Sequence, residues 1–202
     1  TGSTSTATGG GGAAQGRIAP GDFSRFADLG WIDMHVHLRS HHRIDDYVAA
    51  QDRFGMQRMV LQCMTRAESF LDGGRPTFTA EGLLAKAKHP SRFHVFAGLD
   101  LSALATGGEG ALADDLEAQV NELADAGADG LKVYMKSTLV EPMKSQLGFD
   151  YLPDNPVFAK AFTAAGERGL PILIHLDEPY FPSGQKALKL YPKVTWIVTH
   201  LA

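Results

Sequence analysis

The sequence has few of the features that mark disulfide scaffolds, membrane proteins or nucleic-acid-binding proteins. Cys63 is the only cysteine among 202 residues, so no disulfide can form within the chain. No apolar run approaches the ~18–20 residues that a membrane-spanning helix requires. The formal charge is −4, and no Lys/Arg-rich run occurs, which argues against a nucleic-acid partner. With 44% hydrophobic residues, the chain can nevertheless bury a substantial core.

The first residues differ in composition from the rest of the chain. Thr, Ser, Gly and Ala make up almost all of positions 1–15, and such a segment has little apolar surface to bury. We therefore expect a flexible leader over 1–17 and one folded domain over 18–202. The leader lacks the basic and apolar regions of a signal peptide. It begins with Thr, as a mature exported protein or a trimmed chain would. The compartment can therefore be cytoplasmic or exported, and export is slightly favoured.

Beyond the leader, β-rich runs alternate with segments of helical period. The β-rich runs cover 31–38, 58–64, 93–99, 130–135, 171–176 and 194–200. The helical segments cover 44–54, 80–88, 111–126, 156–168 and 185–190. Gly and Pro lie at the joints, where helix ends favour them. This order of nearly continuous apolar strands and helices predicts an α/β fold with a parallel sheet wrapped by helices.

Two architectures fit that order, an open doubly wound sheet and a closed (β/α)8 TIM barrel. No Gly-x-Gly-x-x-Gly follows the first strand, so the dinucleotide-binding form of the open sheet lacks its main motif. The barrel is favoured because histidines end three strands: His35 and His37 the first, His175 the fifth and His200 the sixth. Lys132 is the lone charge in the fourth strand. Catalytic groups of TIM barrels lie at the carboxyl ends of strands, so we expect this barrel, with about six strand–helix units present.

The first strand brings two imidazoles together. His35 and His37 are two residues apart within the run 31–38, and side chains two apart on a strand project from the same face. Two neighbouring neutral imidazoles can both bind one divalent transition-metal ion. The alternative is a pair of structural or solvent-facing histidines, which the uniformly apolar opposite face of the strand disfavours.

With these motifs the sequence resembles the amidohydrolase superfamily of metal-dependent hydrolases. The resemblance rests on Asp33-Met34-His35-Val36-His37, Gly130-Leu131-Lys132, Ile174-His175 and Thr199-His200-Leu201. The last two phrases are most similar to the branch that includes lactonases and aromatic-acid decarboxylases. The family has a further aspartate at the end of strand eight, whereas this chain stops after strand six. We expect a fragment; the alternatives are that another chain supplies the last two strands, or that the protein is a degenerate relative.

The resemblance implies that His35, His37 and His175 bind a divalent ion. One zinc ion is expected, although manganese and iron also suit such ligands. The ion would convert a bound water into hydroxide near neutral pH. His200 and Lys132 are the expected catalytic residues. His200 would contact the substrate or the developing oxyanion, or bind a second ion. Lys132, if carboxylated, would bridge two ions; we favour one ion.

Four further residues are expected around the substrate or behind the ligands. Asp33 would orient an imidazole, and Tyr134, Asp177 and Glu178 would lie near the substrate. The expected function is that of a metal-dependent hydrolase cleaving a C–O or C–N bond of a small lactone, ester or amide. The alternatives are a non-oxidative decarboxylase of an aromatic acid at the same site and a non-catalytic truncated barrel. The expected partner is a small-molecule substrate, with neither nucleic acid nor a membrane span, and a homo-oligomer is left open.

Overall fold

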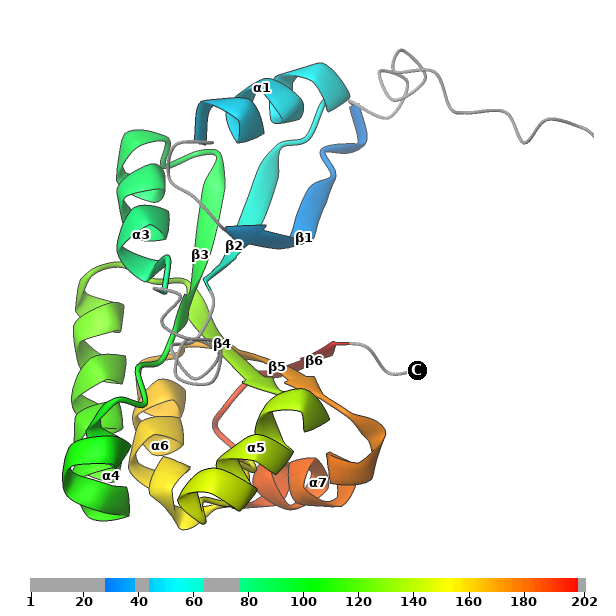
Figure 1. The fold of residues 1–202 in the computed structure, drawn as a ribbon. Coiled ribbons are helices and arrows are strands. Elements are labelled where there is room, and N and C mark those ends of the chain that lie inside the picture. The colour runs from blue at the N-terminus through cyan, green and yellow to red at the C-terminus, as the bar shows by residue number, and fades with distance from the viewer. Residues whose placement is uncertain (1–27, 39–43, 64–76, 200–202) are drawn as a thin grey trace, which may run out of the picture.

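A computed structural model describes residues 28–38, 44–63 and 77–199 (Figure 1). The predicted leader and His200 lie outside these residues. Strands and helices alternate along the described chain, as the sequence pattern predicts.

The strands form one parallel sheet whose order follows the order of the chain. They are β1 (Ile32–Leu38), β2 (Arg58–Cys63), β3 (Phe93–Gly98), β4 (Gly130–Met135), β5 (Ile172–Leu176) and β6 (Trp196–Thr199). All six of these strands were predicted, with ends that differ by one or two residues at most. The sheet curls into a half-barrel, which confirms the predicted fold class with six strands present (Figure 1).

Helices connect successive strands and lie on the outer side of the curl (Figure 1). They are α1 (Ile44–Phe54), α3 (Thr79–Lys88), α4 (Ala103–Asp125), α5 (Ser137–Leu147), α6 (Ala159–Glu167) and α7 (Phe181–Leu190). Two short 3-10 turns, η3 (Pro156–Phe158) and η4 (Glu178–Tyr180), precede α6 and α7. Helix α4 begins earlier than predicted, and its first part meets the rest at Gly108, where φ is 70°. None of the described helices is long and apolar enough to cross a membrane.

Helix α5 is an element that the sequence pattern does not predict. Pro142 lies inside it, and proline in a helix interior removes a backbone donor and disfavours the helix. Packing compensates, because Leu139, Val140 and Met143 are all buried. The helix ends at Gly148, whose φ of 65° lies in the left-handed region that glycine adopts freely.

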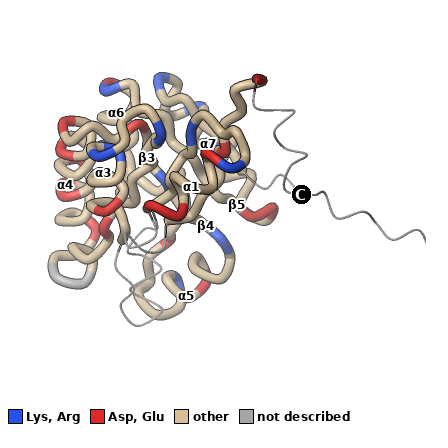
Figure 2. Tube along the Cα trace, turned by 90° about the horizontal axis from the view of Figure 1, so that it is seen from above, with Lys and Arg blue, Asp and Glu red and all other residues tan. Residues whose placement is uncertain are grey.

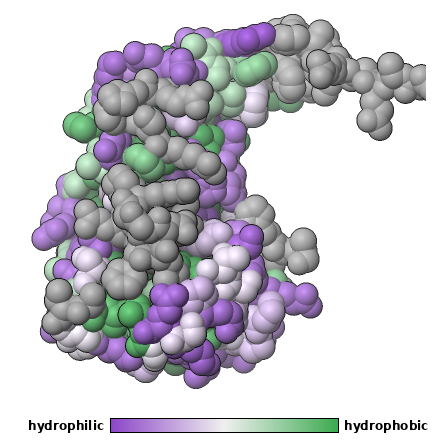
Figure 3. All heavy atoms as spheres, viewed as in Figure 1, coloured by the Kyte–Doolittle hydropathy of each residue, from purple (hydrophilic) through white to green (hydrophobic). Residues whose placement is uncertain are grey.

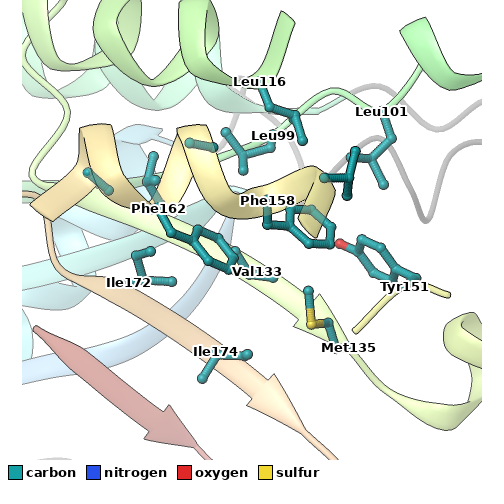
Figure 4. Close-up of a cluster of buried hydrophobic side chains, with 14 of the residues drawn as sticks. Leu99, Leu101, Leu116, Val133, Met135, Tyr151, Phe158, Phe162, Ile172 and Ile174 are labelled. Atoms are coloured by element: carbon teal, nitrogen blue, oxygen red, sulfur yellow. The ribbon is translucent and has the colours of Figure 1, made fainter. Parts of the chain in front are cut away.

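The largest core cluster lies between the outer face of the sheet and helices α4 and α6 (Figure 4). Its buried members include Leu116, Val133, Met135, Phe158, Phe162, Ile172 and Ile174. The rings of Phe158 and Phe162 stack with their centroids 5.3 Å apart and an interplanar angle of 11°. Side chains alternate across a strand, so the residues between these core positions face the other side of the sheet.

Charged residues of both signs are distributed over the helices (Figure 2). Lys160 pairs with Asp114, and Arg168 pairs with Asp125, which joins α6 and the residue after it to α4. Exposed ion pairs of this kind contribute little to stability. The stability of the fold therefore depends on its apolar clusters. Positive and negative side chains are mixed over the described helices.

Candidate metal centre

The inner face of the sheet, the side away from the helices, carries most of the polar residues singled out from the sequence. On β4, Leu131 and Val133 are buried in the helix-side core. Alternation therefore places Lys132 and Tyr134 on the inner face. In the space-filling view the molecule is hollowed on this side, between the β1 end and the β5–β6 end of the sheet (Figure 3).

Strand register aligns the inner-face residues in rows. One row contains His37, Gln62, Phe96 and Gly130; another contains Tyr134, His175 and Thr199. Phe96 belongs to a small apolar cluster with Val60 and Leu173, which fills part of the inner face. The histidines of β1 and β5 thus project from the same side of the sheet, near the carboxyl ends of their strands.

His35 and His37 lie in direct contact, as the sequence predicts for residues two apart. Their Nε2 atoms are 3.0 Å apart, and their ring centroids are 4.9 Å apart. With metal–nitrogen bonds of about 2.0–2.1 Å, a tetrahedral ion spaces two ligating nitrogens roughly 3.3 Å apart, and an octahedral ion spaces adjacent ones about 2.9 Å apart. The observed separation lies between these values. The pair therefore fits the donor set of one divalent ion without a change of backbone.

Strand β1 is bulged at this pair. The register with β2 shifts between Asp33 and Val36. Inside the shift, Oδ1 of Asp33 accepts a hydrogen bond from the backbone N–H of His35 at 3.0 Å. Asp33 was expected to orient an imidazole, whereas the observed contact is with the backbone that carries the imidazole. Its predicted role toward the imidazole stays a prediction.

His175 lies between an aromatic ring and a carboxylate. Its ring centroid is 4.7 Å from that of Tyr134, and its Nε2 is 3.5 Å from Oδ1 of Asp177. The other oxygen of Asp177 accepts hydrogen bonds from the backbone N–H and the hydroxyl of Ser137, at 2.8 and 2.6 Å. Burial alone would raise the pKa of Asp177, but the hydrogen bonds from Ser137 and the nearby His175 and Lys136 lower it below its usual value.

The predicted ligands are brought together only in part. Within the described ranges, no three His, Cys, Asp or Glu side chains lie close enough to hold one metal ion. Strands β2, β3 and β4 separate β5 from β1 in the sheet, so His175 shares the inner face with the β1 pair but lies apart from it. Glu178 is exposed at the start of η4. The predicted position of His200 lies outside the described residues.

Lys132 is almost completely buried. Its side chain is on the inner face, its residue is 1% exposed, and its register neighbours are Gly98 and Leu173. A buried ammonium group requires polar or charged partners. The position is compatible with either of the roles expected from the sequence, so its role stays a prediction.

Gln62 is an inner-face residue that the sequence reasoning missed. Its side chain is fully buried, and its Nε2 donates a hydrogen bond to the Met34 carbonyl at 2.9 Å. Gln62 stands in the apolar run Met59-Val60-Leu61-Gln62-Cys63. A single amide in a buried strand is the signal that could have identified it, because buried polar side chains need a specific partner.

Cys63 is inert as a nucleophile, since burial raises the pKa of its thiol to about 12.

A second polar cluster lies at the opposite, amino-terminal end of the strands. Nη1 of Arg58 contacts Nε2 of His94 at 2.9 Å. Arginine can only donate, so His94 accepts at Nε2 and carries its proton on Nδ1, which lies 3.0 Å from Asp129. Asp129 also accepts from Lys86 and from the Val95 N–H. This end of a TIM barrel serves stability, so we assign these residues no catalytic role.

Comparison with known proteins identifies the fold. No protein-family model matches the chain, and no curated protein matches it in sequence. Several solved structures share its architecture. A 2,6-dihydroxybenzoate decarboxylase in complex with 2,6-dihydroxybenzoate superposes with a TM-score of 0.52 and 14% identity, covering 84% of this chain and 66% of that protein.

Two further solved structures give the same result. A protein assigned as a 2-pyrone-4,6-dicarboxylic acid hydrolase, from Pseudomonas putida, has a TM-score of 0.54 and 17% identity, over 84% of this chain and 56% of that one. A TatD homolog from Escherichia coli K12 has a TM-score of 0.53 and 14% identity, over 85% and 61%. The present chain thus spans less than two thirds of the length of each. All three are amidohydrolase-superfamily proteins. The resemblance drawn from the sequence is confirmed at the level of fold, because this chain has six parallel strands arranged as in these TIM-barrel structures.

Proposed function

We propose that this chain provides the metal-binding part of a metal-dependent hydrolase that acts on a small lactone, ester or amide. The observation that carries the proposal is the pair of imidazole nitrogens 3.0 Å apart at the end of β1. His35 and His37 would hold one divalent ion, for which zinc suits the imidazole ligands. When bound, such an ion supplies a hydroxide near neutral pH and polarises a substrate carbonyl.

The remaining inner-face residues would prepare the site. Asp177 lies 3.5 Å from Nε2 of His175, where it would orient the imidazole. Ser137 fixes the carboxylate of Asp177 through two hydrogen bonds. Tyr134 packs against the imidazole of His175 and limits its rotation. Lys132 and His200 would act on the substrate, as expected from the sequence.

A non-oxidative decarboxylase of an aromatic acid is the second candidate, because one of the similar folds is a 2,6-dihydroxybenzoate decarboxylase. Both reactions would use the same inner face. Product analysis separates them: hydrolysis adds water to the substrate, whereas decarboxylation releases carbon dioxide without net addition of water. A panel of small lactones, esters, amides and aromatic acids should therefore be tested with both readouts.

The first test is the metal content of the full chain, measured by elemental mass spectrometry after purification without chelator or added metal. We expect about one zinc-like ion per chain, and loss of that ion in the double variant His35→Ala/His37→Ala. His89→Ala is the matched control, because His89 lies at the carboxyl-terminal end of α3, away from the inner face. Metal retention and hydrolysis by the double variant would contradict the proposal, and metal retention without turnover on any compound would favour the non-catalytic alternative.

A further inference from the structure

The bulge in β1 depends on hydrogen bonds more than on packing. Among the described strands, β1 pairs with β2 alone, so one neighbour holds it in place. Ile32 and Met34, the two apolar residues before the histidines, are 42% and 47% exposed. They bury too little surface to fix the backbone tightly. Polar contacts within and beside this segment therefore help to determine its conformation.

Two such contacts lie within the shift in register. Asp33 accepts from the His35 N–H at the start of the bulge. Gln62 donates to the Met34 carbonyl from the neighbouring strand. A bulge interrupts the regular ladder of hydrogen bonds, and a carbonyl that loses its ladder partner needs another donor. The Gln62 amide supplies that donor from a side chain that is itself fully buried.

The position of Gln62 connects this contact to the candidate metal centre. Gln62 is the register partner of His37 on β2, and the carbonyl that it binds belongs to the residue before His35. One side chain thus contacts the bulge at its centre and adjoins the second histidine. A shift of the Met34 carbonyl would rotate the peptide that leads into His35 and change the separation of the two Nε2 atoms.

We propose that Gln62 is a positioning residue for the His35–His37 pair, since its hydrogen bond to the Met34 carbonyl holds the bulge that brings the two Nε2 atoms together. This inference rests on the proposed function for its relevance to metal binding. The claim that Gln62 holds the bulge depends only on the observed hydrogen bonds. Gln62 contacts the backbone of β1, and its effect on the pair would be exerted through that backbone.

The chain offers a closely matched control in Gln51. Both glutamines are 0% exposed. Gln51 also donates through Nε2 to a backbone carbonyl, that of Arg92, at 2.8 Å. It lies in α1, on the helix side of the sheet. Replacing either glutamine by methionine removes one buried amide and one hydrogen bond at nearly constant volume, so the general cost to folding should be similar.

The experiment compares Gln62→Met with Gln51→Met in the full chain. Zinc affinity is measured by titration calorimetry with a competing chelator, and Co²⁺ serves as a probe whose visible absorption reports the ligand geometry. We expect Gln62→Met to weaken zinc binding about 10–100-fold, as loss of a supporting residue does at other metal sites, and to alter the Co²⁺ spectrum. Gln51→Met should leave both unchanged, although both variants lose thermal stability.

A metal-independent readout separates this inference from the proposed function. The imidazole ¹⁵N resonances of His35 and His37, recorded in metal-free protein, should change in Gln62→Met and remain as in wild type in Gln51→Met. If wild type binds no zinc, the proposed function fails, and these resonances still decide the role of Gln62. A folded Gln62→Met protein with wild-type resonances and zinc affinity would overturn the inference.

A second variant covers the case in which Gln62→Met does not fold. Asp33→Ala removes the other hydrogen bond of the bulge from a half-buried side chain, so its cost to folding is smaller. We expect the same changes in the imidazole resonances and in zinc affinity. Wild-type behaviour of Asp33→Ala would show that the bulge does not set the geometry of the pair, and the role of Gln62 would fall with it.

Discussion

Asp177 caps the start of α5 from the loop after β5, because its Oδ2 accepts both the backbone N–H and the hydroxyl of Ser137. The same carboxylate faces the imidazole of His175 through Oδ1. One side chain therefore anchors a helix that contains an internal proline and orients a histidine of the inner face. Stability and the geometry of the candidate site are linked at this residue.

Replacement of Asp177 by alanine should lower the free energy of unfolding by about 0.5–2 kcal/mol, as loss of a capping carboxylate does. Because the folded protein lowers the pKa of Asp177, its contribution is present above the usual pKa near 3.8 and is lost as the pH falls through the lower, folded value. Urea unfolding at pH 7 and pH 3 measures both effects. Glu178→Ala, the exposed neighbour, is the control, and equal effects of the two variants would contradict the capping role.

Asp129 should contribute more than an ordinary surface carboxylate at neutral pH. Burial alone would raise its pKa, but hydrogen bonds from Lys86, His94 and the Val95 N–H lower it overall. We expect Asp129→Asn to cost about 1–3 kcal/mol at pH 7, since the bonds to a charged group are lost. The difference from wild type should diminish as the pH falls below the folded pKa.

The comparison variant for Asp129 is Asp114→Asn, which breaks the exposed pair with Lys160. Its effect on the midpoint of urea unfolding should be close to zero. If Asp114→Asn destabilises the protein as much as Asp129→Asn does, the network around His94 has no special role in holding the ends of β2, β3 and β4 together.

Gly130 should not tolerate a larger residue. A Cβ at this position would lie 2.8 Å from the Pro171 carbonyl oxygen and 2.9 Å from Cζ of Phe96, and the backbone oxygen cannot move aside without shifting β5. We expect Gly130→Ala to destabilise the protein by about 1–3 kcal/mol. Gly110→Ala in α4 meets no atom within 4 Å and should stabilise by about 0.5–1 kcal/mol. Thermal unfolding of the two variants should therefore shift in opposite directions.

Lys132 distinguishes one metal ion from two. If the site holds one ion, Lys132→Met should retain the metal content of wild type, because His35 and His37 are unchanged. A carboxylated Lys132 would instead bridge two ions, and the same variant would lose metal. Elemental analysis of both proteins, with addition of bicarbonate to the growth medium as a check on carboxylation, measures the outcome. A fall from two ions to one or none would overturn the single-ion prediction.

The sequence predicted the strands and the contact between His35 and His37 because both follow from strand periodicity. A buried parallel strand is a short apolar run, and residues two apart on it share a face. Helix α5 was missed because Pro142 opposes local helix propensity, and packing of Leu139 and Met143 outweighs it. Tertiary contacts of that kind cannot be read from the local pattern.

The bulge in β1 was also beyond the sequence pattern. A shift of register between Asp33 and Val36 leaves the alternation of residue types unchanged, so nothing in the order of residues marks it. The distance of His175 from the β1 pair depends in turn on how tightly the sheet curls. Curvature accumulates over several strands and is not encoded in any one motif.

Among the strands that the structure describes, the one that carries the two candidate ligands has a neighbour on one side only. Amides in such a position exchange with solvent through local opening, at a lower free energy than global unfolding. An ion that binds His35 and His37 would bind only the closed form of β1 and would slow its hydrogen exchange by mass action. Occupancy of the site would then determine whether this border of the sheet is among the most labile or the most protected parts of the protein.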